Sequence, residues 1–149
     1  MEKQIQIPSK AEIAAHLSGM IPFRTIAYRD QAQTQGEPFF AFHAYLEETY
    51  PLVHEKMEKQ VVGTYSLLYR WKGRSSEKKP ILLMAHQDVV PVPEETLDQW
   101  KYPPFEGTLA EDKVWGRGSL DCKNMLCCEL EAAEALIKQG YVPERDIYF

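Results

Sequence analysis

The sequence lacks long hydrophobic runs, a disulfide framework and an excess of positive charge. None of its apolar stretches approaches the ~20 residues that a membrane-spanning helix needs. The N-terminal segment MEKQIQIPSKAEIAAHL has no apolar core of a signal peptide. The three cysteines are odd in number and crowded at positions 122, 127 and 128, unlike those of a disulfide-stabilised secreted domain. These absences predict a cytoplasmic protein that does not contact membranes.

The charge balance argues against a nucleic-acid partner. The chain has 17 Lys and Arg against 22 Asp and Glu, a net charge of −5, whereas neutralising phosphates needs a basic stripe. Hydrophobic residues make up 44% of the chain, which is ordinary for a globular protein and too many for a disordered one. A length of 149 residues suits one domain or part of a larger one.

Two helical segments are predicted in the N-terminal third. Ser9 and Glu12 form a capping box, after which apolar residues recur at helical spacing until Pro22 ends the helix. Residues 30–38 are polar and loop-like, and Pro38 suits the first turn of a second helix. Residues 52–57 add a short helical turn. The apolar face of the second helix is predicted to comprise Phe39, Phe42, His43, Leu46 and Tyr50.

The period then changes to that of strands. Residues 61–71 alternate in the manner of one strand, and a charged turn over residues 72–79 follows. The continuous apolar run 81–85 predicts a strand buried on both faces, which ends at His86. Residues 108–109 and 114–115 are predicted to pair across Glu111 and Asp112.

A long helix is predicted from Asp121 to Gln139, with Gly140 as its stop. A final strand begins at Asp146. Strand 81–85, this helix and the final strand form a βαβ unit, which is expected to be right-handed. The fold class is therefore α/β, with a mixed, mostly parallel sheet flanked by helices. The buried stripe of the long helix is predicted to be Leu126, Leu130, Ala133 and Ile137.

The first candidate site is His86-Gln87-Asp88, just past the end of a strand, where ligands bind in open α/β sheets. Side chains two apart on extended backbone point the same way. Asp88 could therefore orient the His86 ring for a metal, because a ligating histidine usually gives its other nitrogen to a carboxylate. The alternative is a surface histidine beside a solvated aspartate.

The second candidate site is the glycine turn from Gly116 to Lys123, which precedes the long helix. It fails as a dinucleotide fingerprint because Asp121 occupies the third glycine position of G-x-G-x-x-G. Asp121 is either a helix N-cap or a carboxylate facing a cation. The cysteines lack C-x-x-C spacing; Cys122 lies near a helix N-terminus, and Cys127 and Cys128 are expected to pack within the helix. The histidines without a nearby ligand partner, expected to be structural or surface residues, are His16, His43 and His54.

Taken together, the segments MAHQDVVPVP, QWKYPPFEGTL and VWGRGSLDCKN resemble the M20 family of zinc metallopeptidases, which includes aminoacylases, dipeptidases, succinyl-diaminopimelate desuccinylase and carboxypeptidase S. The upstream segments HLSGMIPFRTIAYRD and FHAYLEETYPLVHEKMEKQVVGTYSLLYRWKG are most similar to the carboxypeptidase S and N-acyl-amino-acid hydrolase branch. The resemblance extends over nearly the whole chain from about residue 12.

The resemblance implies a role for each matching residue. His86 becomes a ligand of one metal, Asp88 the catalytic carboxylate that orients His86, and Asp121 the carboxylate that bridges two zinc ions. It also implies a cis peptide bond after Asp121, and loop-structural roles for Arg117 and Lys123. A complete catalytic domain would hold two zinc ions, with cobalt or manganese as possible substitutes.

The implied activity is hydrolysis of amide or peptide bonds next to a free carboxylate, in small peptides or N-acyl amino acids. Residues 1–149 are then expected to be the N-terminal part of the catalytic domain. The lid (dimerisation) domain and the C-terminal catalytic part, which carries the general base and the remaining ligands, would be absent. This fragment is expected to be inactive and to bind zinc weakly, because a catalytic zinc normally takes three protein ligands. The rival prediction is a non-catalytic α/β binding module. No oligomeric state is predicted.

Overall fold

The structure is a computed structural model that describes residues 5–149. Residues 1–4 lie outside the described residues. They are the start of the N-terminal segment in which no signal-peptide core is predicted. Short 3-10 turns occupy Gln31–Gln33 and Glu94–Gln99. The helices are α1 (Lys10–Met20), α2 (Glu37–Thr49), α3 (Pro51–Lys56) and α4 (Lys123–Lys138), and the strands are β1 (Glu58–Val62), β2 (Ser66–Trp71), β3 (Ile81–Leu82), β4 (Thr108–Ala110), β5 (Lys113–Trp115) and β6 (Ile147–Tyr148).

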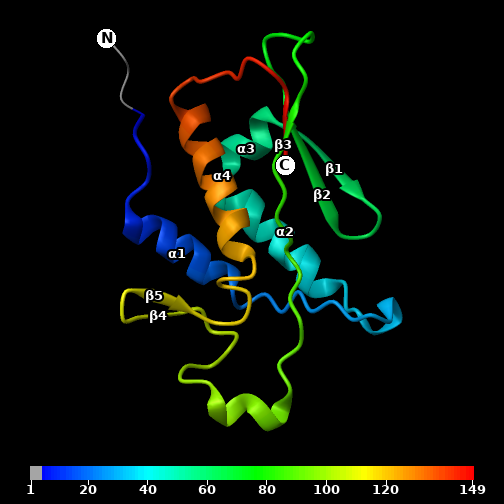
Figure 1. Cartoon of the computed structure of the whole chain (residues 1–149), viewed down its shortest axis with the longest axis vertical. Coiled ribbons are helices and arrows are strands. Elements are labelled where there is room, and N and C mark those ends of the chain that lie inside the picture. The colour runs from blue at the N-terminus through cyan, green and yellow to red at the C-terminus, as the bar shows by residue number, and fades with distance from the viewer. Residues whose placement is uncertain (1–4) are drawn as a thin grey trace.

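A four-stranded mixed sheet with the order β1-β2-β6-β3 forms one layer of the molecule. β3 and β6 are parallel neighbours with α4 between them in sequence, as predicted for the βαβ unit. Helices pack against this sheet, so the α/β class is confirmed (Figure 1). Parallel pairs are the minority in the described sheet, contrary to the expected "mostly parallel" arrangement. Both β1 and β6 pair antiparallel with β2.

The alternating segment 61–71, predicted as one strand, instead contains the end of β1, a turn and β2. β1 and β2 pair antiparallel around a turn in which Gly63 has a φ of 64°. This left-handed conformation is one that glycine adopts readily. All five residues of β1 are exposed. Because neither face of β1 is buried, its sequence Glu58-Lys59-Gln60 carries no hydrophobic alternation that could have revealed the strand.

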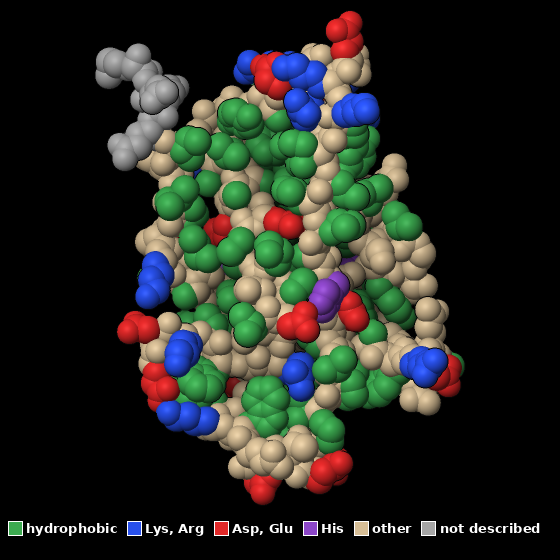
Figure 2. All heavy atoms as spheres, in the orientation of Figure 1, with side chains coloured by type: hydrophobic (Ala, Val, Ile, Leu, Met, Phe, Trp, Pro, Cys, Tyr) green, Lys and Arg blue, Asp and Glu red, His purple; other side chains and the backbone are tan. Residues whose placement is uncertain are grey.

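The apolar run at residues 81–85 is not buried on both faces as predicted. Only Ile81 and Leu82 form a strand, and Leu82 and Met84 are 57% and 75% exposed. β3 is an edge of the described sheet and pairs with β6 alone. Green side chains accordingly extend over much of the face drawn in Figure 2. The composition of the run indicates a buried strand, but the described residues supply a partner on one side only.

The helices match their local signals closely. In α1 the Ser9 hydroxyl accepts a hydrogen bond from the Glu12 amide, and the Glu12 carboxylate accepts one from the Ser9 amide at 2.8 Å. α4 ends before Gly140, whose φ is 76°. The β4–β5 hairpin pairs as predicted across Glu111 and Asp112, which have φ values of 55° and 57°. The predicted α2 face, extended by Tyr50, is buried.

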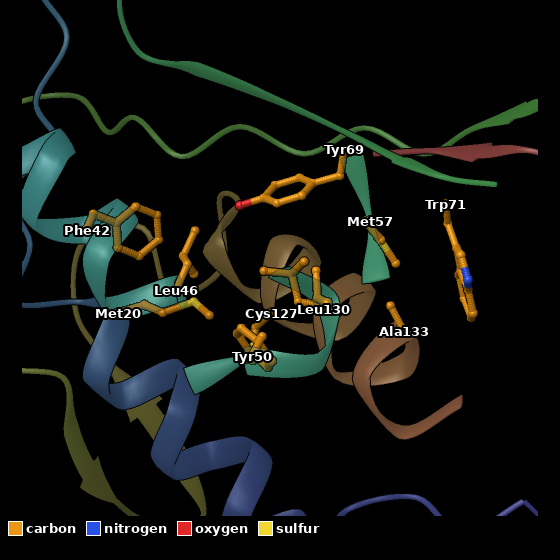
Figure 3. Packing of buried hydrophobic residues seen from close by; sticks show 11 residues of the cluster. Met20, Phe42, Leu46, Tyr50, Met57, Tyr69, Trp71, Cys127, Leu130 and Ala133 are labelled. Carbon is orange, nitrogen blue, oxygen red and sulfur yellow. The ribbon is translucent and has the colours of Figure 1, made fainter. Parts of the chain in front are cut away.

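The hydrophobic core lies between the sheet and the helices α1 to α4 (Figure 3). α1 and α3 contact α4, and Tyr69 and Trp71 of β2 lie against this cluster. Glu134 of α4 accepts hydrogen bonds from the backbone amides of Leu52 and Val53, the first turn of α3. These bonds hold α3 against α4. The clustered residues labelled in Figure 3 are Met20, Phe42, Leu46, Tyr50, Met57, Tyr69, Trp71, Cys127, Leu130 and Ala133.

Within residues 5–149, the structure contains no helix with both the length and the apolar character that crossing a lipid bilayer requires.

Candidate metal centre

The two motifs singled out in the sequence meet in space. Residues 86–88 follow β3, and the glycine loop 116–122 leads into α4. Gly118 has a φ of +85°, and a Cβ atom on it would lie 2.6 Å from Cγ1 of Val89. A side chain at this position would therefore force the glycine loop away from the segment that carries His86. The glycine permits the close approach that brings Asp121 to His86.

His86 lies between the two carboxylates predicted to accompany it. Its Nδ1 is 3.0 Å from the backbone oxygen and 3.4 Å from the Oδ1 atom of Asp88. Its Nε2 is 3.0 Å from Oδ1 of Asp121. Asp88 therefore contacts one ring nitrogen and Asp121 the other. This arrangement suits a histidine that is oriented through Nδ1 and that binds, through Nε2, a metal ion shared with Asp121.

The centre is open to solvent and acidic. The side chains of His86, Asp88 and Asp121 are 49%, 46% and 90% exposed. Burial lowers the pKa of His86, but hydrogen bonds to the Asp88 carbonyl and to Asp121, together with the two carboxylate charges, outweigh this and leave that pKa raised. An exposed histidine flanked by acidic side chains is visible on the face drawn in Figure 2. The same negative surroundings that favour a proton on the ring favour a metal cation.

The helix-capping alternative for Asp121 is wrong. The N-cap of α4 is Cys122, and it makes no side-chain capping bond. Asp121 lies one residue further out, where its carboxylate contacts His86. The peptide bond between Asp121 and Cys122 is cis, as the resemblance implied.

The three cysteines differ in their surroundings. Cys122 Sγ accepts a hydrogen bond from the His86 amide at 3.2 Å and lies 3.6 Å from the His86 carbonyl oxygen. Ligand atoms of His86, Asp121 and Cys122 all lie within 4.8 Å of one another. Cys127 is buried in the core, as expected for a packing residue, whereas Cys128 is exposed, contrary to that expectation.

Replacing Cys122 by alanine is expected to weaken zinc binding about 10-fold, within the 10–100-fold range typical for groups that hold a metal ligand in place. The substitution removes the sulfur that accepts the His86 amide hydrogen. Zinc affinity measured by competition with a chromophoric chelator checks this result. Cys128→Ala on the exposed face of α4 is the matched control and should leave the affinity unchanged. Equal zinc affinities of the two variants would show that Cys122 does not contribute to metal binding.

Lys123 and Arg117 have the loop-structural roles expected of them. The Lys123 ammonium group is fully buried and donates to the backbone oxygens of Met20 at 2.9 Å and Phe23 at 2.8 Å. Burial lowers the pKa of Lys123 to about 7. The Arg117 guanidinium lies over the Trp100 ring, 5.4 Å from its centroid. Lys123 thus ties the start of α4, and with it Asp121, to the end of α1.

Behind the centre, folding adds residues that sequence reasoning left unassigned. Gln87 contacts His43 of α2, a histidine for which no partner was predicted. Nothing in the sequence links positions 43 and 87, because only the tertiary fold brings α2 beneath this segment. A cavity of about 590 Å³ adjoins His86 and Asp88, and its wall includes Tyr65, Leu67 and Leu126.

Known proteins resemble this chain in sequence and in fold. Residues 82–149, which include both motifs, match the model of "Peptidase family M20/M25/M40". The chain is 50% identical over 111 residues to carboxypeptidase S of Saccharomyces cerevisiae, a match that covers 73% of this chain and 19% of that protein. It is 32% identical over 141 residues to the N-fatty-acyl-amino acid synthase/hydrolase PM20D1 of Xenopus tropicalis, covering 93% of this chain and 27% of the relative.

A solved structure has the same fold. It is the M20 family metallo-carboxypeptidase Sso-CP2 from Sulfolobus solfataricus, with a TM-score of 0.66 and 22% sequence identity. The match covers 92% of this chain and 29% of that protein. The chain thus spans less than a third of the length of each of these three proteins.

Proposed function

Because the chain belongs to peptidase family M20/M25/M40, we propose that it supplies the first part of the catalytic domain of a metal-dependent hydrolase. The proposed substrates are small peptides and N-acyl amino acids, cleaved at the amide bond next to a free carboxylate. One observation carries this proposal: Nε2 of His86 and the Asp121 carboxylate lie 3.0 Å apart, while Nδ1 of His86 faces Asp88.

These residues fit a zinc ion by the chemistry of their donor atoms. Zinc in proteins takes histidine nitrogen and carboxylate oxygen. Asp121 is 90% exposed, so its carboxylate remains accessible to cations while one oxygen contacts His86. His86 and Asp121 would hold one ion, and Asp121 would share its carboxylate with a second. Bound metal lowers the pKa of a coordinated water and polarises the scissile carbonyl.

The residues of this chain position the histidine. When Nδ1 of His86 carries its hydrogen and donates to the Asp88 backbone oxygen at 3.0 Å, Nε2 keeps its lone pair for a ligand. The Asp88 carboxylate, 3.4 Å from Nδ1, stabilises the same orientation of the ring. Asp88 therefore acts through His86 rather than on a substrate bond.

The remaining ligands and the general base are proposed to come from a longer polypeptide. β6 runs parallel to β3, with Ile147 opposite Ile81 and Tyr148 opposite Leu82. A continuation of β6 in this register would pass beside Ala85 and His86. An acidic pair at the end of that continuation would lie next to the centre. The 149-residue chain by itself is expected to show no zinc-dependent turnover.

His86→Ala in the longer protein tests the proposal. The variant is expected to lose zinc and activity together, because it lacks a metal ligand. Asp88→Asn should instead keep most of the zinc and lose rate by about 10–100-fold. Zinc content by elemental analysis and hydrolysis of dipeptides and N-acyl amino acids are the measurements. Unchanged zinc stoichiometry in His86→Ala would exclude this centre, and a zinc-free, inactive wild type would favour a non-catalytic α/β module.

A further inference from the structure

The segment that carries His86 and Asp88 lies outside the hydrogen-bond ladder of the sheet. Its last backbone bond to the sheet runs from the Leu83 amide to the Tyr148 oxygen at 2.8 Å. The next runs from the Val89 amide to the Thr25 oxygen, also at 2.8 Å. Among residues 5–149, residues 84–88 exchange no backbone–backbone hydrogen bond with any other described residue. The described bonds that hold residues 86 and 87 to the rest of the fold therefore all involve a side chain.

The Gln87 side chain bonds to two other parts of the fold. Its Nε2 donates to the backbone oxygen of Tyr65 at 2.5 Å, in the turn between β1 and β2. Its Oε1 lies 2.9 Å from Nε2 of His43 on α2. The backbone oxygen of Gln87 accepts a hydrogen bond from the Thr25 hydroxyl at 2.6 Å. Three separate segments thus converge on the residue between the two site residues.

His43 is the donor in its bond to Gln87. The Gln87 amide nitrogen is already directed at the Tyr65 oxygen, so the amide oxygen faces His43 and can only accept. His43 is 9% exposed, and burial lowers its pKa, which keeps the ring neutral at physiological pH. The hydrogen of the neutral ring must then be on Nε2. The Phe40 ring packs edge-on against His43, with centroids 6.3 Å apart.

Fixing Gln87 fixes its neighbours. His86 and Asp88 contact each other on the solvent side, whereas Gln87 contacts the interior. Side chains that alternate along an extended segment turn together, so a rotation that freed Gln87 would also turn His86 away from Asp121. The 3.0 Å approach of His86 to Asp121 therefore depends on contacts made behind the segment.

We propose that His43 and Gln87 are a positioning pair that sets the direction of the predicted metal ligand His86. Neither residue is one of the predicted metal ligands. The expected effect of this pair on zinc affinity rests on the proposed function. Its expected effect on the order of residues 84–88 does not.

The test compares two histidines in the 149-residue chain. His43→Phe and Gln87→Leu remove the pair. His54→Phe is the matched control, because His54 lies on another helix, α3, and its Nε2 makes a bond of the same length, 2.9 Å, to the Tyr69 hydroxyl. We expect zinc dissociation constants about 10–100-fold higher for the first two variants and an unchanged constant for His54→Phe. His43→Gln, which restores an N–H donor, should recover part of the affinity.

A metal-free measurement separates the inference from the proposed function. Amide hydrogen exchange at His86 should be at least about 10-fold faster in His43→Phe and Gln87→Leu than in the wild type and His54→Phe, since the segment opens more readily without its anchor. The proposed function is decided separately, by the zinc content of the longer protein. If the 149-residue wild type binds too little zinc for a constant to be measured, the exchange result alone decides on the pair. The positioning role of His43 and Gln87 would be refuted by an unchanged exchange rate at His86 in His43→Phe. Equal losses of zinc affinity in His43→Phe and His54→Phe would refute it as well.

Discussion

Asp121→Asn is expected to lower hydrolysis by the longer protein by more than about 100-fold, beyond the 10–100-fold loss typical of groups that only orient a ligand. An amide offers one neutral oxygen, so it cannot supply the charge or the second anionic oxygen that two divalent cations share. The side chain is 90% exposed and does not cap α4, so folding should be unaffected.

Circular dichroism and zinc content accompany the activity assay on dipeptides and N-acyl amino acids. Without metal, the variant should keep the thermal unfolding midpoint of the metal-free wild type. With zinc present, it should bind less zinc than the wild type. Asp112→Asn, an exposed aspartate in the β4–β5 turn, is the matched control and should retain full activity. Activity within a few-fold of wild type in Asp121→Asn would refute the bridging role.

Lys123→Ala is expected to destabilise the chain by about 3 kcal/mol. It leaves the buried backbone oxygen of Met20 without its donor, at about 1–3 kcal/mol. The part-buried oxygen of Phe23 loses one of two donors and keeps the Thr25 amide at 2.8 Å. It also removes the amine that lies over the Phe42 ring, 4.8 Å from its centroid, and empties the buried space of the aliphatic stem. Removing the buried amine relieves its own desolvation cost, which offsets part of the sum. Such a loss is a large fraction of the 5–15 kcal/mol typical of a domain.

Urea unfolding of the 149-residue chain measures this effect. Lys138→Ala at the exposed C-terminal end of α4 is the control, and it should stay within about 0.5 kcal/mol of the wild type. A loss below about 1 kcal/mol in Lys123→Ala would mean that water replaces the amine at both carbonyl oxygens.

Local signals predicted the helices, and tertiary contacts decided the rest. The capping box at Ser9 and the stop at Gly140 act within a few residues, so the sequence reveals them. The meeting of His86 with Asp121 could be anticipated from the two motifs. The exposure of Leu82 could not, because an apolar run does not reveal how many partner strands it has. β1 was missed for a related reason, since an exposed strand has no apolar alternation.

Side-chain bonds between distant segments could not be predicted either. Lys123 was expected to serve the loop, but its acceptors are carbonyl groups about a hundred residues away in sequence. The bond between His43 and Gln87 joins a helix to the irregular segment that follows β3. Backbone oxygens and single polar pairs carry no spacing pattern, so only the folded arrangement identifies them.

The tight turn of the β4–β5 hairpin is a position at which the thermal stability of the protein could be raised. Glu111 and Asp112 both have positive φ values, which non-glycine residues adopt at a cost. Glu111 also accepts hydrogen bonds from Lys101 and Tyr102, whereas Asp112 is exposed. Glycine at position 112 would relieve the strain in the turn and keep those contacts. Protein engineers could therefore gain thermal tolerance there without touching the chemistry near His86.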